Sequence, residues 1–507
     1  MKSLFSHARD YPTWRYFWLV VLAALLARFV VGYTNDRFIH PDEMFQYYEP
    51  AHRLLYGYGI VTWEWLYGIR SWLIPLLIAG LMKVPNLVGL DGVEYYEFTV
   101  VLGLSALNTT MVIAMYRFAQ MVTDELTARV AMVLGAIWPI FLYFGPTPLP
   151  NLMAGVGLMW IAVLVLRQPT TLSLVMLGVI SALTLGVRYQ VIPAVGLMHL
   201  FAMYTLRTRY FVVLFAGLAT LAPIGYLDVI FWRGFFSSFL DNFYFNFTEK
   251  ISEKFGQEPV SWYFTTYVAD TGALIIPMLI GCFLIMKRAW PIWLSIAIGV
   301  IFMHVPAHKE FRFIVWMLPF GLIGLAYLMV YIEPRFAPKP LVQGFFAFWV
   351  SVFTVIFLAF QYEAFEPLPH RKETISIVRE IRSDPDLRGI HIDAAYRWWD
   401  RWGGYYYLNR PVPYYYKDVN HDEILLVGDY DESSVSHIVT DYPEPPSDDA
   451  ELIMQTATFW VWKRTNIPEP WGDKPYNMVY IQRLGIKAEP LGPRYPLISD
   501  GFGPASE

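Results

Sequence analysis

Acidic, basic and aromatic side chains gather in one early segment, residues 40–71, which separates strongly apolar stretches. The segment reads HPDEMFQYYEPAHRLLYGYGIVTWEWLYGIRS. A carboxylate beside a bilayer is costly unless it is solvated or paired, so an ionisable cluster at that position is a functional-site hypothesis by default. A loop that only joined two helices would not need these residue types. The segment therefore predicts a polar site at a membrane surface.

The polar residues at the start of this segment are spaced for one face of a helix. If residues 42–56 are helical, Asp42, Gln46 and Glu49 lie on the same side, because they are three or four residues apart. Such a face would direct two carboxylates toward a common pocket. Acidic residues also stabilise a helix N-terminus electrostatically, so an ordinary solvated helix with an acidic start is the alternative interpretation.

Two tryptophans flank an acid further along, in the TWEW sequence at residues 62–65. The face of a tryptophan ring is a good stacking surface for a sugar, which makes Trp63 a candidate binding residue. Tryptophan is also common at membrane interfaces, where it serves as an anchor. Anchoring does not explain Glu64 or Arg70, so these two residues are candidates for the same site.

A second polar cluster, PAHKEFRF at residues 306–313, interrupts two apolar runs much later in the chain. Lysine and arginine a few residues apart can bind a phosphate, arginine through paired donors and lysine as a point charge. Cations that extend from a helix end toward water are the alternative explanation for Lys309 and Arg312. That explanation leaves His308 and Glu310 unaccounted for, and the cluster therefore favours anion binding.

A third interruption lies at residues 188–190, inside the apolar sequence GVRYQVIPAV. One arginine at a helix junction is weak evidence for a site by itself. Arg188 and Gln190 gain weight because the charge pattern places them on the same side of the membrane as the two clusters.

Composition bounds the class of protein. Hydrophobic residues make up 56% of the 507 residues and charged residues 16%, and the mean hydropathy is +0.39. These values indicate a polytopic membrane protein. The net charge of -5 gives no case for nucleic acid as a partner, because phosphate-backbone binding needs clustered cations. The single cysteine, Cys282, excludes an intrachain disulfide and a thiolate metal site.

Apolar stretches long enough, or nearly so, to cross a bilayer predict about eleven spans. They cover approximately residues 14–32, 98–117, 130–145, 150–166, 171–187, 191–206, 210–232, 262–286, 290–304, 313–332 and 341–360. Short basic connections alternate with connections that are longer or rich in proline and aromatic residues. Cytoplasmic loops carry the lysine and arginine excess, so every chemically rich segment is predicted on the opposite, non-cytoplasmic face. This parity requires that the short apolar piece at residues 72–84 does not cross.

The expected fold is an all-α membrane domain followed by a small α/β domain outside the membrane. Residues 1–365 form the first, with external loops at 33–97 and 235–262, and residues 371–507 form the second. In the tail, RKETISIVREIRSDPDLRG predicts an amphipathic helix and a turn, and GIHID and EILLVGDY predict short strands.

The motifs named above resemble those of the lipid-phosphate-mannose-dependent alpha-mannosyltransferases of N-glycan and GPI-anchor synthesis, glycosyltransferase family 22 of the GT-C class. The resemblance rests on HPDEMFQYYEPAH, YGYGIVTWEW with IRSWLIP, and the late HKEFRF. It covers about residues 1–365 and weakens sharply in the tail. The family's usual turn is represented only by PTPLPN around Asn151, and its usual Arg-Pro-Thr segment only by residues 188–190.

The resemblance implies an integral membrane glycosyltransferase that moves a hexose, with mannose as the expected sugar, from a polyprenyl- or dolichyl-phosphate donor to a glycan or glycolipid acceptor. Asp42 is the expected general base of an inverting displacement, with Glu43 as its alternative. The expected donor-phosphate ligands are His308, Lys309, Arg312 and Arg188. The residues expected to hold the donor or acceptor sugars are His40, Gln46, Glu49, Trp63, Glu64, Arg70, Glu310 and Gln190.

Three further expectations concern cofactors, class and compartment. No cofactor is expected, because the cations can stabilise the departing phosphate, although a divalent metal is compatible with His40, Asp42 and Glu49. A polytopic lipid transporter or flippase is the alternative function, but transporters place binding residues near the bilayer midplane, and here the charges collect at span ends. The absence of disulfides favours a bacterial inner membrane with a periplasmic site, with the ER membrane and a lumenal site as the alternative.

Overall fold

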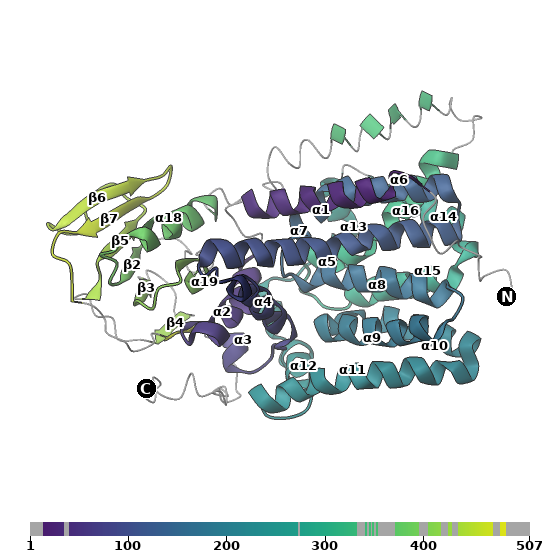
Figure 1. The fold of residues 1–507 in the computed structure, drawn as a ribbon, viewed down its shortest axis with the longest axis horizontal. Helices are drawn as coiled ribbons and strands as arrows, with labels where there is room; N and C mark the ends of the chain where they lie inside the picture. Colours follow the sequence, from purple (N-terminus) through teal and green to yellow (C-terminus); the bar gives the residue numbers. More distant parts are fainter. Residues whose placement is uncertain are drawn as a thin grey trace. The chain divides into compact units, whose positions relative to one another are not determined.

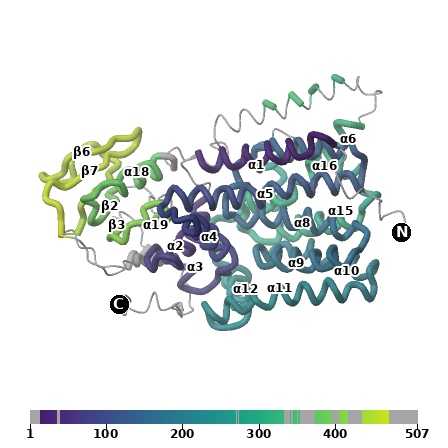
Figure 2. The backbone as a smooth tube through the Cα atoms, in the orientation of Figure 1, coloured from purple at the N-terminus to yellow at the C-terminus, as the bar shows by residue number. Residues whose placement is uncertain are grey.

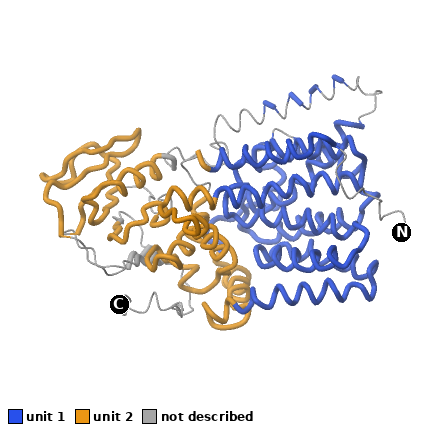
Figure 3. Tube along the Cα trace, viewed as in Figure 1, with its two compact units in different colours: residues 1–32, 101–226, 252–367 blue, residues 33–100, 227–251, 368–507 orange. Residues whose placement is uncertain are grey.

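The computed structural model describes residues 14–34, 40–271, 274–331, parts of 340–352, 371–394, 404–416, 424–427, 434–469 and 477–482. The chain divides into two compact units (Figure 3). Unit 1 contains residues 1–32, 101–226 and 252–367, and unit 2 contains residues 33–100, 227–251 and 368–507. The predicted first external loop thus belongs to the same unit as the tail.

Unit 1 is a bundle of apolar helices (Figure 1). Its helices are α1 (Phe17–Thr34), α5 (Val93–Val122), α6 (Glu125–Ile137), α7 (Pro139–Phe144), α8 (Pro150–Leu166), α9 (Thr171–Val187), η4 (Tyr189–Val191), α10 (Ile192–Leu206), η5 (Arg207–Arg209), α11 (Tyr210–Phe231), η7 (Ile251–Phe255), α13 (Trp262–Asp270), α14 (Ile275–Ile285), η8 (Met286–Arg288), α15 (Trp290–Met303), η9 (Phe311–Met317) and α16 (Leu318–Tyr331). Several of them pack without intervening side chains. A Cβ atom added to Gly281 of α14 would overlap the carbonyl oxygen of Gly324 in α16, the close approach that small residues allow in membranes.

Among the described residues, four helical stretches are long and apolar enough to cross a membrane. They are Phe17–Thr34, Val93–Val122, Tyr189–Phe231 and Phe311–Tyr331, and shorter apolar helices accompany them. The structure thus confirms a largely helical protein with apolar spans, and the count of about eleven spans stays a prediction. The last predicted stretch, 341–360, falls largely outside the described residues.

Unit 2 combines the first loop, residues 227–251 and the tail. Its helices are η2 (Glu43–Tyr48), α2 (Glu49–Tyr56), α3 (Trp63–Leu66), α4 (Leu73–Lys83), η3 (Pro85–Val88), α12 (Ser237–Phe243), η6 (Tyr244–Thr248), α18 (Arg371–Ser383) and α19 (Gly404–Leu408). The helix predicted from residue 371 is α18, and strands β2 and β4 lie within the predicted GIHID and EILLVGDY runs. The helix predicted at 42–56 is present too, but its first part, η2, is a π-helix.

Two sheets complete unit 2, and Figure 2 traces the larger one in the tail beside α18. The strands are β1 (Gly59–Thr62), β2 (Ile390–Asp393), β3 (Tyr414–Tyr416), β4 (Ile424–Val427), β5 (His437–Thr440), β6 (Ala450–Gln455), β7 (Trp460–Arg464) and β8 (Asn477–Gln482). The larger sheet has the order β3-β2-β5-β7-β6, and the smaller one β1-β8-β4. In the smaller sheet, β1 of the first loop pairs in parallel with β8 of the tail, with Gly59 opposite Asn477. The tail therefore completes a sheet that the first loop begins.

One buried cation ties three helices of unit 1 together. Arg28 of α1 is fully buried, and its guanidinium donates to Asn108 Oδ1 at 2.6 Å, to the Gly135 carbonyl at 2.8 Å and to the Ala136 carbonyl at 3.1 Å. A further bond goes to its own helix, to the Ala24 carbonyl at 3.0 Å. A charge inside an apolar bundle is tolerated when its donors are satisfied in this way.

We expect Arg28→Met to destabilise unit 1 by about 3 to 5 kcal/mol, because three acceptors on α5 and α6 would lose their donor in an apolar interior. Thermal unfolding in detergent measures the effect. Arg209→Met, at an exposed position in η5, is the matched control and should change the melting temperature little. Equal melting temperatures for the two variants would contradict the assigned role of Arg28.

Candidate active site

The first acids of the early segment have separate tasks. Asp42 precedes η2, its backbone N–H donates to His40 Nδ1 at 3.1 Å, and its carboxylate lies 3.4 Å from the same nitrogen. Its side chain is 24% exposed. Glu43 is only 3% exposed, and its carboxylate accepts the backbone N–H of His40 at 3.0 Å. Of the two carboxylates predicted as the base, Asp42 is therefore the accessible one.

A second carboxylate of the early segment, Glu64, is bonded to other side chains. Glu64 of α3 is buried, and its Oε1 accepts Nε2 of Gln46 at 3.1 Å and lies 3.6 Å from Nη2 of Arg70. Burial raises the pKa of Glu64, the positive charge of Arg70 opposes that rise, and the negative charge of Asp42 adds to it.

The predicted common face of the first helix is not formed. Gln46 reaches Glu64, whereas Glu49 binds the backbone N–H of Ile60 at 2.9 Å and of Tyr406 at 2.8 Å. The reason is the π-helical geometry of η2, which closes i to i+5 bonds and so changes the spacing that an α-helix would impose.

Trp63 is a core residue of unit 2. It is 7% exposed and belongs to an aromatic cluster with Trp65, Trp72, Trp232 and Phe245. Residues 227–251 hold the turn that follows it, since Trp232 Nε1 donates to the Arg70 carbonyl at 3.0 Å and Asn242 Nδ2 donates to the Ile69 carbonyl at 3.1 Å. This packing fixes the positions of Glu64 and Arg70.

The late cluster in unit 1 is an internally bonded turn. Glu310 accepts from His308 Nε2 at 3.0 Å and from Arg312 Nε at 2.5 Å. Lys309 is 5% exposed, and its ammonium donates to the carbonyls of Glu258 and Pro306 at 2.9 Å and of Ala307 at 3.4 Å. Because three carbonyls already surround that ammonium, Lys309 holds the loop together in this structure and is poorly placed for the phosphate predicted at it.

Two arginines flank one aromatic ring in the same unit. The guanidinium carbons of Arg188 and Arg312 each lie 5.4 Å from the ring centroid of Phe313. The sequence places them 124 positions apart, yet α9 ends directly before Arg188 and η9 carries Arg312. Gln190 lies beside them in the chain, in η4, at intermediate exposure. Two cations that are distant in sequence thus contact the same aromatic ring.

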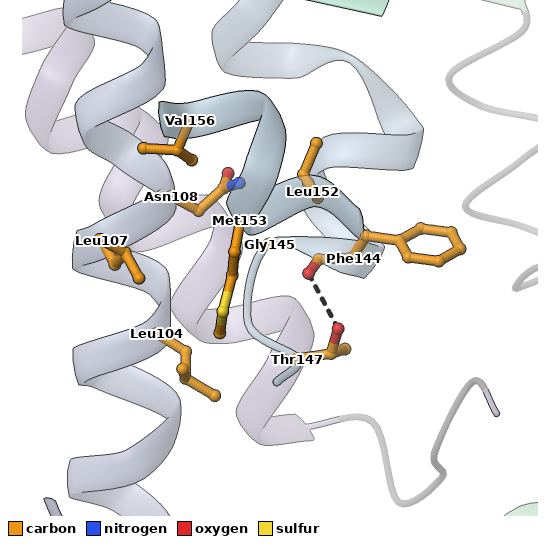
Figure 4. Close-up of a pocket in the computed structure, with 9 residues that line it drawn as sticks. All are labelled: Leu104, Leu107, Asn108, Phe144, Gly145, Thr147, Leu152, Met153 and Val156. Atoms are coloured by element: carbon orange, nitrogen blue, oxygen red, sulfur yellow. Dashed lines mark hydrogen bonds between the residues drawn. The ribbon is translucent and has the colours of Figure 1, made fainter. Parts of the chain in front are cut away.

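Sequence reasoning left the role of Asn151 open. It is fully buried at the start of α8, and neither side-chain amide atom has a hydrogen-bond partner in the described part of the chain. Its neighbours in sequence, Thr147, Leu152 and Met153, line a small pocket together with Asn108 and Gly145 (Figure 4). The family turn that PTPLPN represents is the signal that pointed to this position.

The early cluster belongs to unit 2 and the late cluster to unit 1. Their predicted convergence around one donor stays a prediction. Within the described residues, no group of three His, Cys, Asp or Glu side chains is arranged to hold a metal ion.

The buried polar pair that joins the first loop to the tail should make the stability of unit 2 depend on pH. Burial raises the pKa of Glu49 from 4.5 to about 7 and lowers the pKa of His52 from 6.5 to about 4. The stability that Glu49 contributes to the folded state is present below pH 4.5 and is lost as the pH rises through about 7. The stability that His52 contributes is present above pH 6.5 and is lost as the pH falls through about 4. Between pH 4.5 and pH 6.5 the two changes in stability have opposite signs and largely cancel.

We therefore expect the contribution of Glu49 to stability to fall by about 1 kcal/mol from pH 6.5 to pH 8, as its carboxyl ionises in the folded state through a pKa of about 7. Glu49→Gln removes this fall, because its side chain does not ionise. Melting temperatures of both proteins in detergent across pH 5 to 8 give the comparison, since all other groups cancel in the difference. A fall of the same size in Glu49→Gln would contradict the assignment.

Comparison with known proteins gives the context of these clusters. The chain matches the Alg9-like mannosyltransferase family over residues 16–395. It is 27% identical over 325 residues to GPI alpha-1,2-mannosyltransferase 3 of Mus musculus, covering 62% of this chain and 59% of that protein. Identity to the Homo sapiens protein of the same name is 24% over 351 residues, covering 68% and 61%. The chain thus spans about three fifths of the length of these relatives.

Among solved structures, ArnT from Cupriavidus metallidurans bound to undecaprenyl phosphate is similar in fold, with a TM-score of 0.56 and 12% identity, covering 90% of this chain and 100% of that one. The apo form of the same protein gives a TM-score of 0.58. The comparisons give no support to the transporter alternative. The prediction of a bacterial inner membrane is not supported either, because the similar mannosyltransferases come from animals, a yeast and a plant. From its motifs, its apolar helices and the match over residues 16–395, we conclude that this chain is an integral membrane protein of the Alg9-like mannosyltransferase family.

Proposed function

We propose that this protein transfers a mannose from a lipid-phosphate donor to a hydroxyl of a glycolipid acceptor on the non-cytoplasmic face of the membrane. The observation that carries the proposal is the exposure of the Asp42 carboxylate, which lies beside His40. Two other acids of this segment, Glu43 and Glu64, are buried. A general base needs that combination of access and fixed position.

In the proposed reaction, the acceptor hydroxyl oxygen attacks the anomeric carbon of the donor sugar. Its proton passes to the Asp42 carboxylate, the bond from the anomeric carbon to the phosphate oxygen breaks, and the lipid phosphate departs. The direct displacement inverts the anomeric configuration. Glu64 and Arg70, held by Gln46 and the aromatic cluster, then form the sugar-facing wall next to the base.

The departing phosphate gains negative charge, and we assign its stabilisation to Arg188 and Arg312, the pair that flanks Phe313. The internal bonds of the late turn support this choice, because Glu310 fixes Arg312 through Nε, and Lys309 is engaged by backbone carbonyls. In the proposal these two guanidinium groups supply charge that a metal ion would otherwise provide, so the mechanism needs no divalent cation. The solved ArnT of similar fold is bound to undecaprenyl phosphate, itself a lipid phosphate.

The names of the similar proteins suggest the acceptor. Both relatives named above are GPI alpha-1,2-mannosyltransferases, so a GPI-type glycolipid with an exposed mannose hydroxyl is the first acceptor to test. The ER membrane, with the site toward the lumen, is the compartment that this acceptor class implies.

We expect Asp42→Asn to lower turnover by at least about 100-fold, because the amide cannot accept the proton. The assay follows transfer of radiolabelled mannose from a dolichyl-phosphate donor to a mannosylated GPI precursor by the purified protein. Glu43→Gln is the matched control: the amide oxygen can still accept the His40 N–H, and turnover should stay within about tenfold of the wild type. Unchanged turnover in Asp42→Asn would assign the base to another group.

We expect Arg188→Lys and Arg312→Lys each to lower kcat by about 10- to 100-fold, since lysine keeps the charge but loses the planar paired donors. Arg209→Lys, at an exposed position in η5, is the control. Addition of EDTA should leave wild-type turnover unchanged. Loss of turnover with EDTA, together with full activity in both lysine variants, would mean that a metal ion holds the phosphate.

A further inference from the structure

The tail inserts a short segment, residues 404–409, into the first loop within unit 2. The backbone N–H of Tyr406 donates to Glu49 Oε1 at 2.8 Å, while the N–H of Ile60 donates to Oε2 of the same carboxylate at 2.9 Å. His52 Nε2 lies 3.0 Å from Asn409 Oδ1. Glu49 and His52 are both fully buried. Two residue types that suggest chemistry are therefore used to hold a piece of the tail.

The backbone of the segment is shaped for this contact. Gly404 has φ +50, and a Cβ atom there would overlap Glu49 Oε1. Asn409 also lies in the left-handed region, with φ 47, and its carboxamide oxygen is 3.4 Å from the Tyr58 hydroxyl as well. The Tyr48 and Tyr406 rings stack with centroids 4.5 Å apart. Glycine and asparagine are the residues that tolerate this backbone conformation best.

These contacts fix the two elements that carry the acids of the site. Glu49 directly follows η2, which begins next to Asp42 and carries Gln46. Ile60 lies in β1, which runs directly into α3 and Glu64. The buried carboxylate of Glu49 is bonded both to β1 and to the tail. It therefore sets the distance between η2, which follows Asp42, and β1, which leads to Glu64.

We propose that residues 404–409 form a positioning element for the catalytic loop, and that Glu49 and His52 act through this element and make no contact with the sugar. The inference rests on the proposed function for its effect on turnover, and it reassigns Glu49, which was predicted to hold a sugar. The segment lies beyond residues 16–395, the part that matches the family. The tail thereby becomes a part of the catalytic unit.

Gly404→Ala tests the proposal in the full-length protein. We expect kcat to fall at least tenfold while KM for the lipid-phosphate sugar stays within about twofold, because the added methyl group displaces Glu49 and with it the acids. Gly89→Ala is the matched control, since Gly89 also has a positive φ, +77, in the same unit, with no atom within 4 Å of an added Cβ. Wild-type kcat in a folded Gly404→Ala protein would overturn the proposal.

A second pair of variants separates positioning from folding. Asn409→Gly keeps the left-handed backbone but removes the carboxamide, whereas Asn409→Asp keeps an acceptor oxygen for His52. We expect a fall in kcat in Asn409→Gly and recovery to within about twofold of the wild type in Asn409→Asp. Equal activity in the two variants, whether full or lost, would overturn the role of the His52 contact.

Hydrogen exchange distinguishes failure of this inference from failure of the proposed function. The Ile60 amide, which donates to Glu49, should exchange at least tenfold faster in Gly404→Ala than in the wild type or in Gly89→Ala, whatever reaction the protein catalyses. Faster exchange without any mannose transfer by the wild type would refute the function but support the positioning element. Unchanged exchange would refute the element.

Discussion

The main chain satisfies several of the deeply buried charges of this protein's described residues, and the structure depends on these bonds. Arg28 donates to three backbone carbonyls, Lys309 to three others, and Glu49 accepts two backbone N–H groups. An ion removed from water must recover its lost hydrogen bonds inside the protein, and peptide groups are fixed partners that do not titrate. Each of these side chains therefore acts as a connector between segments distant in sequence.

The side chains assigned to chemistry have a different environment. Glu64 is held by Gln46 and Arg70, Arg312 by Glu310, and Asp42 lies against His40. Contacts between side chains can be exchanged for contacts with a substrate at lower cost than contacts that hold the backbone together. Lys309 illustrates the distinction, because its residue type and its place in the HKEFRF motif suggest phosphate binding, whereas its partners indicate a structural role.

The sequence was sufficient to predict the local elements. Apolar stretches indicated the helices, amphipathic spacing indicated the helix that starts at residue 371, and short β-like runs indicated β2 and β4. The family motifs were enough to select Asp42, Glu64 and Arg312 as candidates. These features depend on residues close in sequence, where periodicity carries the information.

What could not be predicted depends on contacts between distant residues. The hydrogen bond between Glu49 and Tyr406 joins positions 357 apart. No pattern in either segment indicates that the two segments are in contact. The π-helical turn in η2 escaped prediction because a helix is expected to have α-helical spacing, which would put Gln46 and Glu49 on one face. The pairing of β1 with β8 was missed for the same reason as the Glu49 contact, and the first loop was assigned to the membrane part alone.

The distance between Glu49 and its partner also has a consequence for biosynthesis. At about 5 to 20 residues per second, the ribosome needs roughly 20 to 70 s to reach Tyr406 after it has made Glu49, 357 positions earlier. During that interval the carboxylate has no tail amide to bind, and the first loop cannot reach its final packing. The first loop of the nascent chain must therefore stay unfinished until the segment around Tyr406 has been made.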